Sequence, residues 1–218
     1  MMYERPPLEP DRTAVVVVDM INWMFRWRSN STPVTTNPGY ERRIEETVIP
    51  NHLRLIDGCR KAGGKVVYLR AGASAPDFRD AVAGMRELMR AAEAYEGSHG
   101  AALIDELSVE PGDIDLLKLG SGGFTSSALD THLRHLGVRH VIYTGVATNA
   151  CVLLTAMAGF DLGYHGYIVT DATAAKTPDA HAGALAVTGD HYALGVTTAR
   201  MLDMLAGQSA DEVRGAVR

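Results

Sequence analysis

The chain has 218 residues, of which 46% are hydrophobic and 22% are charged, so one sizeable core is expected and neither disorder nor a fibrous fold is indicated. A formal net charge of −5 argues against a nucleic-acid-binding protein, which normally carries a basic face. No apolar run reaches the ~18 residues that cross a bilayer. The N-terminal sequence does not resemble a signal peptide, and two cysteines make no disulfide framework. We therefore expect one domain over residues 1–218, in the cytoplasm and without a membrane partner.

The first half of the chain alternates strand-like with helix-like segments. AVVVVDM, at residues 14–20, is a continuous apolar run closed by an acid, which is typical of a strand buried on both faces of a parallel sheet. In the helical segment that follows, Pro50 marks a break or kink and Gly63-Gly64 the end. The predicted elements of this half are a strand at 14–20, a helix at 39–64, a strand at 65–70 and a helix at 80–97.

The alternation becomes regular in the second half of the chain. One helix there has a serine-based N-terminal cap and Gly137 just past its end. The predicted elements are strands at 115–119, 140–146 and 165–172, helices at 126–137, 149–163 and 178–193, and a last strand running into a short helix at 194–202. About six strands with helical crossovers predict an α/β fold of three layers, with a central, mostly parallel six-stranded sheet.

Three reactive side chains follow strands of this sheet: Asp19, Lys118 and Cys151. Taken singly, they have ordinary interpretations as a turn residue, a solvated lysine and a small core residue. Because the carboxyl ends of parallel strands share one edge, however, the three should converge there. A helix start and a nearby cation favour a thiolate at Cys151, and Asp19 can move its proton. The set predicts nucleophilic catalysis without a histidine.

Three segments resemble the motifs of the isochorismatase-like cysteine hydrolases, the superfamily of nicotinamidase, N-carbamoylsarcosine amidase and the ureide hydrolases. They are AVVVVDM around Asp19, KLGSGGFTSSALDTHLRHLGV around Lys118 and TGVATNACV around Cys151, and the similarity extends over about residues 13–204. The resemblance implies that Cys151 is the nucleophile, Asp19 the proton shuttle and Lys118 the residue that orients and stabilises the charges. It also implies a cis peptide between Val146 and Ala147, with the Ala147 and Cys151 N–H groups forming an oxyanion hole.

Departures from the family patterns narrow the expected activity. Metal-dependent nicotinamidases carry a second acid and a closely spaced histidine pair, whereas His99 is the only histidine between residues 53 and 131 here. Isochorismatases proper lack the nucleophilic cysteine. We expect no metal and no cofactor, and a small linear amide or ureide as substrate, as in ureidoacrylate and biuret hydrolases. By resemblance we also expect a homodimer or homotetramer.

Several residues are candidates for substrate binding. Asn22 lies where the superfamily often has an amide near the substrate, although a turn asparagine is an equal alternative. Phe124 resembles an aromatic residue that lines the pocket in ureide and amide hydrolases, and a core phenylalanine is the alternative. In the segment NWMFRWR, Trp23 together with Arg26 or Arg28 could hold a planar or anionic substrate, or these side chains could simply pack.

The remaining polar and reactive residues receive structural interpretations. Thr148 and Asn149 are expected to hydrogen-bond their own turn rather than the substrate, and Asp171 to hold a loop. Cys59 is expected to be a structural residue within a helix. The histidines of one helix and its exit show no ligand spacing and are predicted to lie on the surface: His132, His135 and His140.

Two other classes of function are alternatives to a cysteine hydrolase. LGSGGFT lies between a strand and a helix, as a phosphate-binding loop does, but it fails the G-x-G-x-x-G pattern at Thr125. A non-catalytic binding protein of the same fold is the second alternative, against which the intact Asp19, Lys118 and Cys151 argue. Within the superfamily, a maleamate- or nicotinamide-type amidase also stays open.

Overall fold

The fold is built around one six-stranded sheet in which every strand is parallel to its neighbours, in the order β3-β2-β1-β4-β5-β6. The computed structural model describes residues 6–25 and 38–207. The strands are β1 (Thr13–Val18), β2 (Lys65–Ala71), β3 (Ile114–Lys118), β4 (His140–Val146), β5 (His165–Ala174) and β6 (Ala193–Val196). The prediction of an α/β fold with a six-stranded sheet is confirmed.

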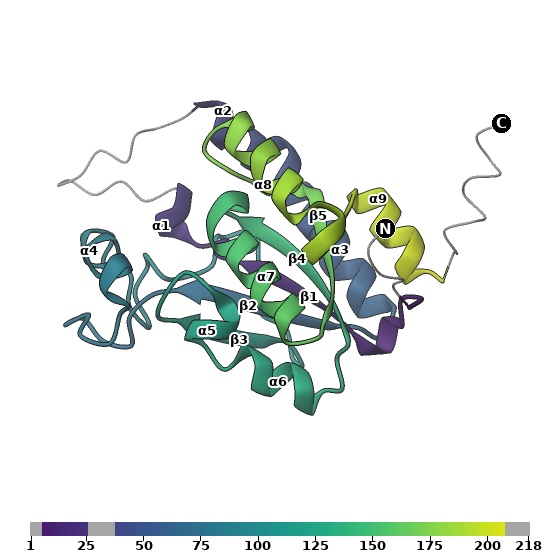
Figure 1. Ribbon diagram of the computed structural model, residues 1–218. Helices are drawn as coiled ribbons and strands as arrows, with labels where there is room; N and C mark the ends of the chain where they lie inside the picture. Colours follow the sequence, from purple (N-terminus) through teal and green to yellow (C-terminus); the bar gives the residue numbers. More distant parts are fainter. Residues whose placement is uncertain (1–5, 26–37, 208–218) are drawn as a thin grey trace.

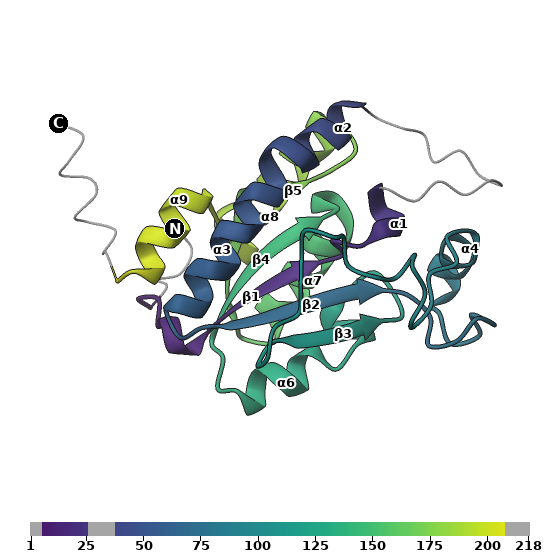
Figure 2. The same ribbon diagram turned by 180° about the vertical axis from the view of Figure 1, so that it is seen from behind.

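Helices cover both faces of this sheet (Figures 1 and 2). The α-helices are α1 (Asn22–Phe25), α2 (Pro38–Arg43), α3 (Ile49–Lys61), α4 (Ala83–Ala91), α5 (Gly123–Ser126), α6 (Leu129–His135), α7 (Leu153–Asp161), α8 (Pro178–Tyr192) and α9 (Thr198–Leu205). Figure 1 shows α5, α6, α7 and α8 on the near face, and Figure 2 shows α3 and α9 on the other. The expected three layers are therefore present.

The alternation of side chains along the central strands explains the two cores. In β1, Val15 and Val17 point into the core under α3 and α9, whereas Val16 and Val18 point into the core under α6 and α7. All six residues of β1 are buried, because the strand is covered on both faces and lies between two others. Burial on both faces of the sheet explains why residues 14–18 form a continuous apolar run.

Pro50 does not break the helix expected over residues 39–64, although a π-helical turn divides that helix into two α-helices. A π-helical turn, Ile44–Val48, joins α2 to α3, and Pro50 lies in the first turn of α3. A proline is tolerated there because the N–H it lacks would have no partner within the helix. The chain therefore stays helical from Pro38 to Lys61, and Gly63 follows it with φ 80°.

The helix expected over residues 80–97 is shorter, because α4 ends at Ala91. Glu93 takes a left-handed conformation with φ 48°, and the N–H of Ala94 donates back to the carbonyl of Met89, as in a Schellman ending. Residues 94–96 then hydrogen-bond to Ala73 instead of continuing the helix. This excursion between β2 and β3 forms its own small apolar cluster, which lies beyond the strand ends (Figure 1).

Among the described residues, no helix is both long enough and apolar enough to span a bilayer.

Candidate active site

Asp19 lies directly after β1, at the carboxyl edge of the sheet. Its backbone is left-handed, with φ 52°, a conformation that aspartate adopts more readily than most residues. Its N–H donates to the carbonyl of Leu69 (2.9 Å), and its Oδ1 accepts a hydrogen bond from the N–H of Ala71 (2.9 Å). Two contacts to β2 therefore fix both the backbone and the carboxylate of Asp19.

Lys118, the last residue of β3, reaches across β2 to this carboxylate. Its Nζ lies 2.8 Å from Asp19 Oδ2, and both side chains are 0% exposed. The same ammonium donates to the carbonyl of Gly120 (2.8 Å) and lies 3.6 Å from Cys151 Sγ. A buried ammonium with three electronegative neighbours keeps its charge, because each neighbour replaces a water that burial removed.

Cys151 lies in a π-helical turn, Thr148–Val152, that connects β4 to α7. Its side chain is 4% exposed, and its Sγ lies 3.3 Å from the hydroxyl oxygen of Ser121. The structure thus brings together Asp19, Lys118 and Cys151, as expected from their positions after parallel strands. Ser121 belongs to the same site, and nothing in the sequence distinguished it from the other serines of the KLGSGGFTSS segment.

The charges in this site determine where the protons are. Burial raises the pKa of the Asp19 carboxyl, and the Lys118 ammonium opposes that rise. Burial, and after it the negative charge of Asp19, raise the pKa of the Cys151 thiol to about 11 against the lowering effects of Lys118 and Ser121. At neutral pH the resting thiol therefore holds its proton.

This result corrects the expectation that the helix start and Lys118 make Cys151 a thiolate at rest. Desolvation and Asp19 outweigh the cation. The arrangement instead suits transfer of the proton from sulfur to Asp19 as the thiol attacks, a role of general base rather than of preformed thiolate.

Replacing Asp19 with asparagine is expected to accelerate alkylation of Cys151 by iodoacetamide at neutral pH. The substitution removes a negative charge that raises the pKa of the thiol and leaves the Lys118 cation, so the pKa falls. Each unit of decrease gives about a tenfold larger thiolate fraction. The measurement is the rate of labelling at each cysteine by peptide mass spectrometry.

Cys59 is the internal control for this experiment. Its pKa is also raised to about 11, mainly by burial, and Asp19 is not among the charges that act on it. Its labelling should therefore be the same in both proteins. Unchanged or slower labelling of Cys151 in the variant would contradict the charge balance described above.

The Val146–Ala147 peptide bond, between β4 and the nucleophile turn, is cis. Gly145 precedes it with φ 100°, and a Cβ there would lie 2.0 Å from the carbonyl oxygen of Val18. Only glycine fits so close to β1. The carbonyl of Ala147 accepts hydrogen bonds from the N–H groups of Ala150 (3.0 Å) and Val152 (3.2 Å), which hold the turn in place. The oxyanion hole formed by the N–H groups of Ala147 and Cys151 stays a prediction.

Asn22 and Trp23, at the start of α1, both make contacts near the candidate site. The Asn22 amide is buried, and its nitrogen donates to the carbonyl of His99 (3.1 Å). Trp23 Nε1 donates to the carbonyl of Ala71 (3.0 Å), the residue whose N–H binds Asp19. These bonds have structural roles, and contact of either residue with a substrate stays a prediction. The other two candidates of this segment, Arg26 and Arg28, lie outside the described residues.

The ring of Phe124 stacks on Tyr164, with the ring centroids 5.3 Å apart. The Tyr164 hydroxyl in turn donates to Asp130 (2.8 Å), so Phe124 belongs to a packed layer between α5, α6 and the start of β5. Tyr164 precedes β5 and therefore lies toward the amino ends of the strands. The contacts of Phe124 are those of a packing residue, and its role in a substrate pocket stays a prediction.

Two further residues near the site were not singled out by the sequence. Tyr40, in α2, lies close enough to Asp19 and Cys151 that their negative charges add to burial in raising the pKa of its phenol. His99 lies beside Asn22, with its Nε2 3.4 Å from the amide nitrogen. No periodicity or motif connects either residue with strand ends so far away in the chain.

His140 is buried, which corrects its prediction as a surface residue. It is the first residue of β4, its side chain is 0% exposed, and its ring packs at 5.2 Å from that of His165. Burial in the sheet lowers its pKa, to which the neighbouring His165 adds. It opens the strand predicted at 140–146, and its interpretation as a surface residue came from grouping it with the histidines of the preceding helix. His135 is exposed and His132 is half-buried on α6.

Of the residues expected to be structural, Cys59 and Asp171 have contacts of that kind. Cys59 is buried under β1, and its thiol lies 3.4 Å from the carbonyl oxygen of Lys65. Asp171 accepts hydrogen bonds from both the N–H (2.7 Å) and the hydroxyl (2.8 Å) of Thr198 at the start of α9. The expectation for Thr148 needs correction, because its buried hydroxyl contacts His181 of α8 rather than its own turn, and Asn149 is exposed.

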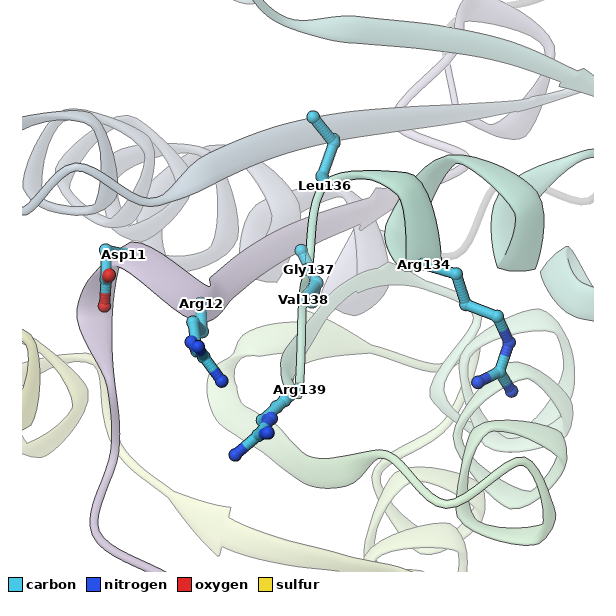
Figure 3. Close-up of a pocket in the computed structure, with 7 residues that line it drawn as sticks. All are labelled: Asp11, Arg12, Arg134, Leu136, Gly137, Val138 and Arg139. Atoms are coloured by element: carbon cyan, nitrogen blue, oxygen red, sulfur yellow. The ribbon is translucent and has the colours of Figure 1, made fainter.

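A pocket of about 590 Å³ lies at the opposite, amino edge of the sheet (Figure 3). It is lined by residues that precede β1 and β4, among them Arg12, Arg134 and Arg139. These arginines form ion pairs with Glu9 and Asp130. Because the pocket lies at the other edge of the sheet from Asp19, Lys118 and Cys151, it is not part of the candidate site. Within residues 6–25 and 38–207, no three His, Cys, Asp or Glu side chains are grouped so as to hold a metal ion.

Comparison with known proteins places this chain within a described family. A family model for the isochorismatase domain matches residues 13–200. A cysteine hydrolase from Pseudomonas syringae is 25% identical, with 96% of this chain and 100% of that chain covered and a TM-score of 0.80. An N-carbamoylsarcosine amidase from Thermoplasma acidophilum is 27% identical, with coverages of 86% and 96% and a TM-score of 0.67. An isochorismatase-like hydrolase from Alkaliphilus metalliredigens is 25% identical, with coverages of 88% and 98% and a TM-score of 0.69.

Proposed function

This chain belongs to the isochorismatase-like cysteine hydrolases, and from that membership we propose that it hydrolyses the carbon–nitrogen bond of a small linear amide or ureide through a thioester on Cys151. The observation that carries the proposal is the buried contact of three groups: Asp19 paired with Lys118 at 2.8 Å, and Cys151 Sγ 3.6 Å from the same ammonium. An amide is favoured over an ester because the site keeps an acid that can protonate a leaving nitrogen.

The first half of the proposed reaction forms the thioester. Asp19 takes the proton of the Cys151 thiol while the sulfur attacks the carbonyl carbon of the substrate. The N–H groups of Ala147 and Cys151 hold the resulting oxyanion, and Lys118 compensates the negative charge that has moved within the site. Asp19 then gives its proton to the nitrogen, the C–N bond breaks, and ammonia or an amine leaves.

The second half releases the acyl group. Asp19, again a carboxylate, takes a proton from a water molecule as that water attacks the thioester carbonyl. The tetrahedral intermediate collapses, the carboxylic or carbamic acid leaves, and the proton on Asp19 returns to the Cys151 sulfur. The balance is one water consumed for one C–N bond hydrolysed. Ser121, 3.3 Å from the sulfur, can donate to the thiolate whenever it is the leaving group.

A screen of small substrates tests this proposal. Ammonia release is measured for ureides, carbamoyl amino acids, maleamate and nicotinamide, with a blank lacking protein as control. We expect turnover of a ureide or a carbamoyl compound, the class to which the name of the N-carbamoylsarcosine amidase neighbour points. Turnover of maleamate or nicotinamide alone would move the chain to another amidase branch. Ammonia from none of these compounds would favour a non-catalytic binding protein.

A further inference from the structure

A chain of polar contacts, which no part of the proposed mechanism uses, leads away from the nucleophile turn. The hydroxyl oxygen of Thr148, the first residue of that turn, lies 2.8 Å from His181 Nδ1 in α8. The other ring nitrogen, His181 Nε2, lies 3.1 Å from an Arg43 Nη2 in α2. Residues far apart in the sequence thus meet beside Cys151, where α2 and α8 lie next to each other in both views (Figures 1 and 2).

Arg43 is itself held by the sheet. The pairing of β4 with β5 shifts between Tyr143, opposite Ile168, and Gly145, opposite Thr173, so β5 bulges there. Arg43 donates to two carbonyls of this bulge, those of Thr170 (2.9 Å) and Thr173 (3.1 Å from Nη2 and 3.2 Å from Nε). The guanidinium therefore has a fixed position against the irregular end of the sheet.

These contacts favour one of the two neutral forms of the His181 ring. An Nε2–H would face the Arg43 guanidinium, which has only donors, so this contact favours the form in which Nε2 accepts. The proton of the neutral ring is then on Nδ1, which donates to the Thr148 hydroxyl oxygen. Burial lowers the pKa of His181 and the positive charge of Arg43 lowers it further, and together they outweigh a hydrogen bond with the Thr170 backbone that raises it, so the ring stays neutral.

Thr148 connects these contacts to the reacting groups. It is 0% exposed, it follows Ala147 directly, and Cys151 lies three residues beyond it in the same turn. A shift of Thr148 would move the Ala147 peptide and the Cys151 sulfur relative to Asp19 and Lys118, which other strands hold.

We propose that His181 and Arg43 are positioning residues, in which the Nδ1–H form of His181 holds Thr148, and thereby the Cys151 turn, at the distance from Asp19 that proton transfer requires. The inference rests on the proposed function, because it concerns the same reaction. Neither residue touches the substrate. Together, His181 from α8 and Arg43 from α2 connect the nucleophile turn to the bulge of β5.

The test compares two matched pairs of variants on the best substrate of the screen. Thr148→Val keeps the shape of the side chain but removes the acceptor, whereas Thr148→Ser keeps the acceptor. His181→Leu removes the donor, whereas the amide nitrogen of His181→Asn can replace Nδ1. We expect Thr148→Val and His181→Leu to lower kcat by about 10- to 100-fold with KM within about twofold, and the Ser and Asn variants to keep most of kcat.

A readout without substrate separates this inference from the proposed function. ¹⁵N NMR of the imidazole in the wild-type protein at neutral pH should show a proton on Nδ1 of His181 and none on Nε2. A proton on Nε2, or wild-type kcat in both Thr148→Val and His181→Leu, would overturn the positioning role even if the enzyme is an amidase. A wild-type protein that hydrolyses no amide would overturn the proposed function, while the NMR result would still decide the His181–Thr148 contact.

Melting temperatures of the four variants show whether a loss of kcat reflects unfolding. If Thr148→Val does not fold, the comparison of His181→Leu with His181→Asn tests the positioning role instead. A uniform loss of kcat in all four folded variants, the Ser and Asn controls included, would also contradict the proposal, because it would show sensitivity to any change rather than to the hydrogen bond.

Discussion

Replacing Cys151 with alanine is expected to lower ammonia release by about 10⁴- to 10⁶-fold, the range seen when the nucleophile of a covalent hydrolase is removed. Asp19 and Lys118 remain in the variant, but neither can form the thioester, and a water attacking directly would lack the fixed position of the sulfur. The fold should persist, because only the sulfur atom is lost and Lys118 keeps its contacts with Asp19 and the Gly120 carbonyl. Ammonia release and the melting temperature are measured together.

The matched control is Cys59→Ala. It removes the same atom from the other cysteine, which belongs to α3 and lies close to Lys65 at the start of β2, and so toward the amino ends of the strands. It should lose some stability, because a core atom is removed, but keep wild-type turnover. Wild-type turnover in Cys151→Ala would remove the covalent mechanism, and a loss of turnover in Cys59→Ala with its fold intact would show that the comparison is not specific.

Replacing Lys118 with methionine is expected to damage both stability and activity. The ammonium is 0% exposed and neutralises Asp19, so its removal leaves a buried carboxylate without a positive charge to pair with. Breaking one side of a buried ion pair costs about 3–5 kcal/mol in the free energy of unfolding. Turnover should fall by at least about 10²- to 10³-fold, because the group that compensates the developing charge is lost.

The stability loss of Lys118→Met should depend on pH in a defined direction. Burial already raises the pKa of Asp19, and without Lys118 nothing of comparable strength opposes that rise. Between the unfolded and the folded pKa, the folded variant binds more protons than the unfolded chain, so its stability falls as pH rises. The deficit relative to wild type should therefore be smaller in mild acid than in mild base.

The double variant Asp19→Asn/Lys118→Met is the control for this second prediction. It removes both charges, so most of the lost stability should return while turnover stays absent. Urea unfolding of the wild type and the three variants at several pH values gives the coupling between the two residues. Equal deficits at all pH values, or no recovery in the double variant, would contradict the ion pair as the cause.

The fold was predictable from the sequence because the apolar patterns are strong. The strand predicted at 140–146 coincides with β4, and the strand predicted at 14–20 starts one residue after β1 starts and ends two residues beyond it. The N-cap of α6 is Ala128 rather than a serine, but the hydroxyl oxygen of the preceding Ser127 accepts from the N–H of Leu129 (3.2 Å), and Gly137 follows the helix with φ 68°. Local chemistry of this kind needs no tertiary information.

Only the residues of the candidate site that lie at strand ends were predictable from the sequence. Asp19, Lys118 and Cys151 each follow an apolar run, so a parallel sheet brings them together. The protonated resting thiol was not predictable, because the effect of burial depends on the surrounding packing. Tyr40 and His181 were missed for the same reason: their helices meet the site through packing that leaves no periodic trace in the sequence.

The cis peptide before Ala147 is a feature that neither apolar patterns nor strand ends could predict. Neither Val146 nor Ala147 has a local property that favours such a bond, so only the resemblance of TGVATNACV to a known motif pointed to it. The bulge in β5 that binds Arg43 had no such resemblance and was not expected. Family motifs thus supply information that local physical chemistry does not contain.

The most direct test of the central claim is to isolate the acyl group on Cys151. The Asp19→Asn variant should react with p-nitrophenyl acetate, whose leaving group needs no proton, but should hydrolyse the thioester slowly because it lacks the base. We predict a stoichiometric burst of p-nitrophenolate and an acetyl group on the peptide of Cys151, with none on the peptide of Cys59. No adduct on Cys151, or one that forms equally on Cys59, would contradict the account.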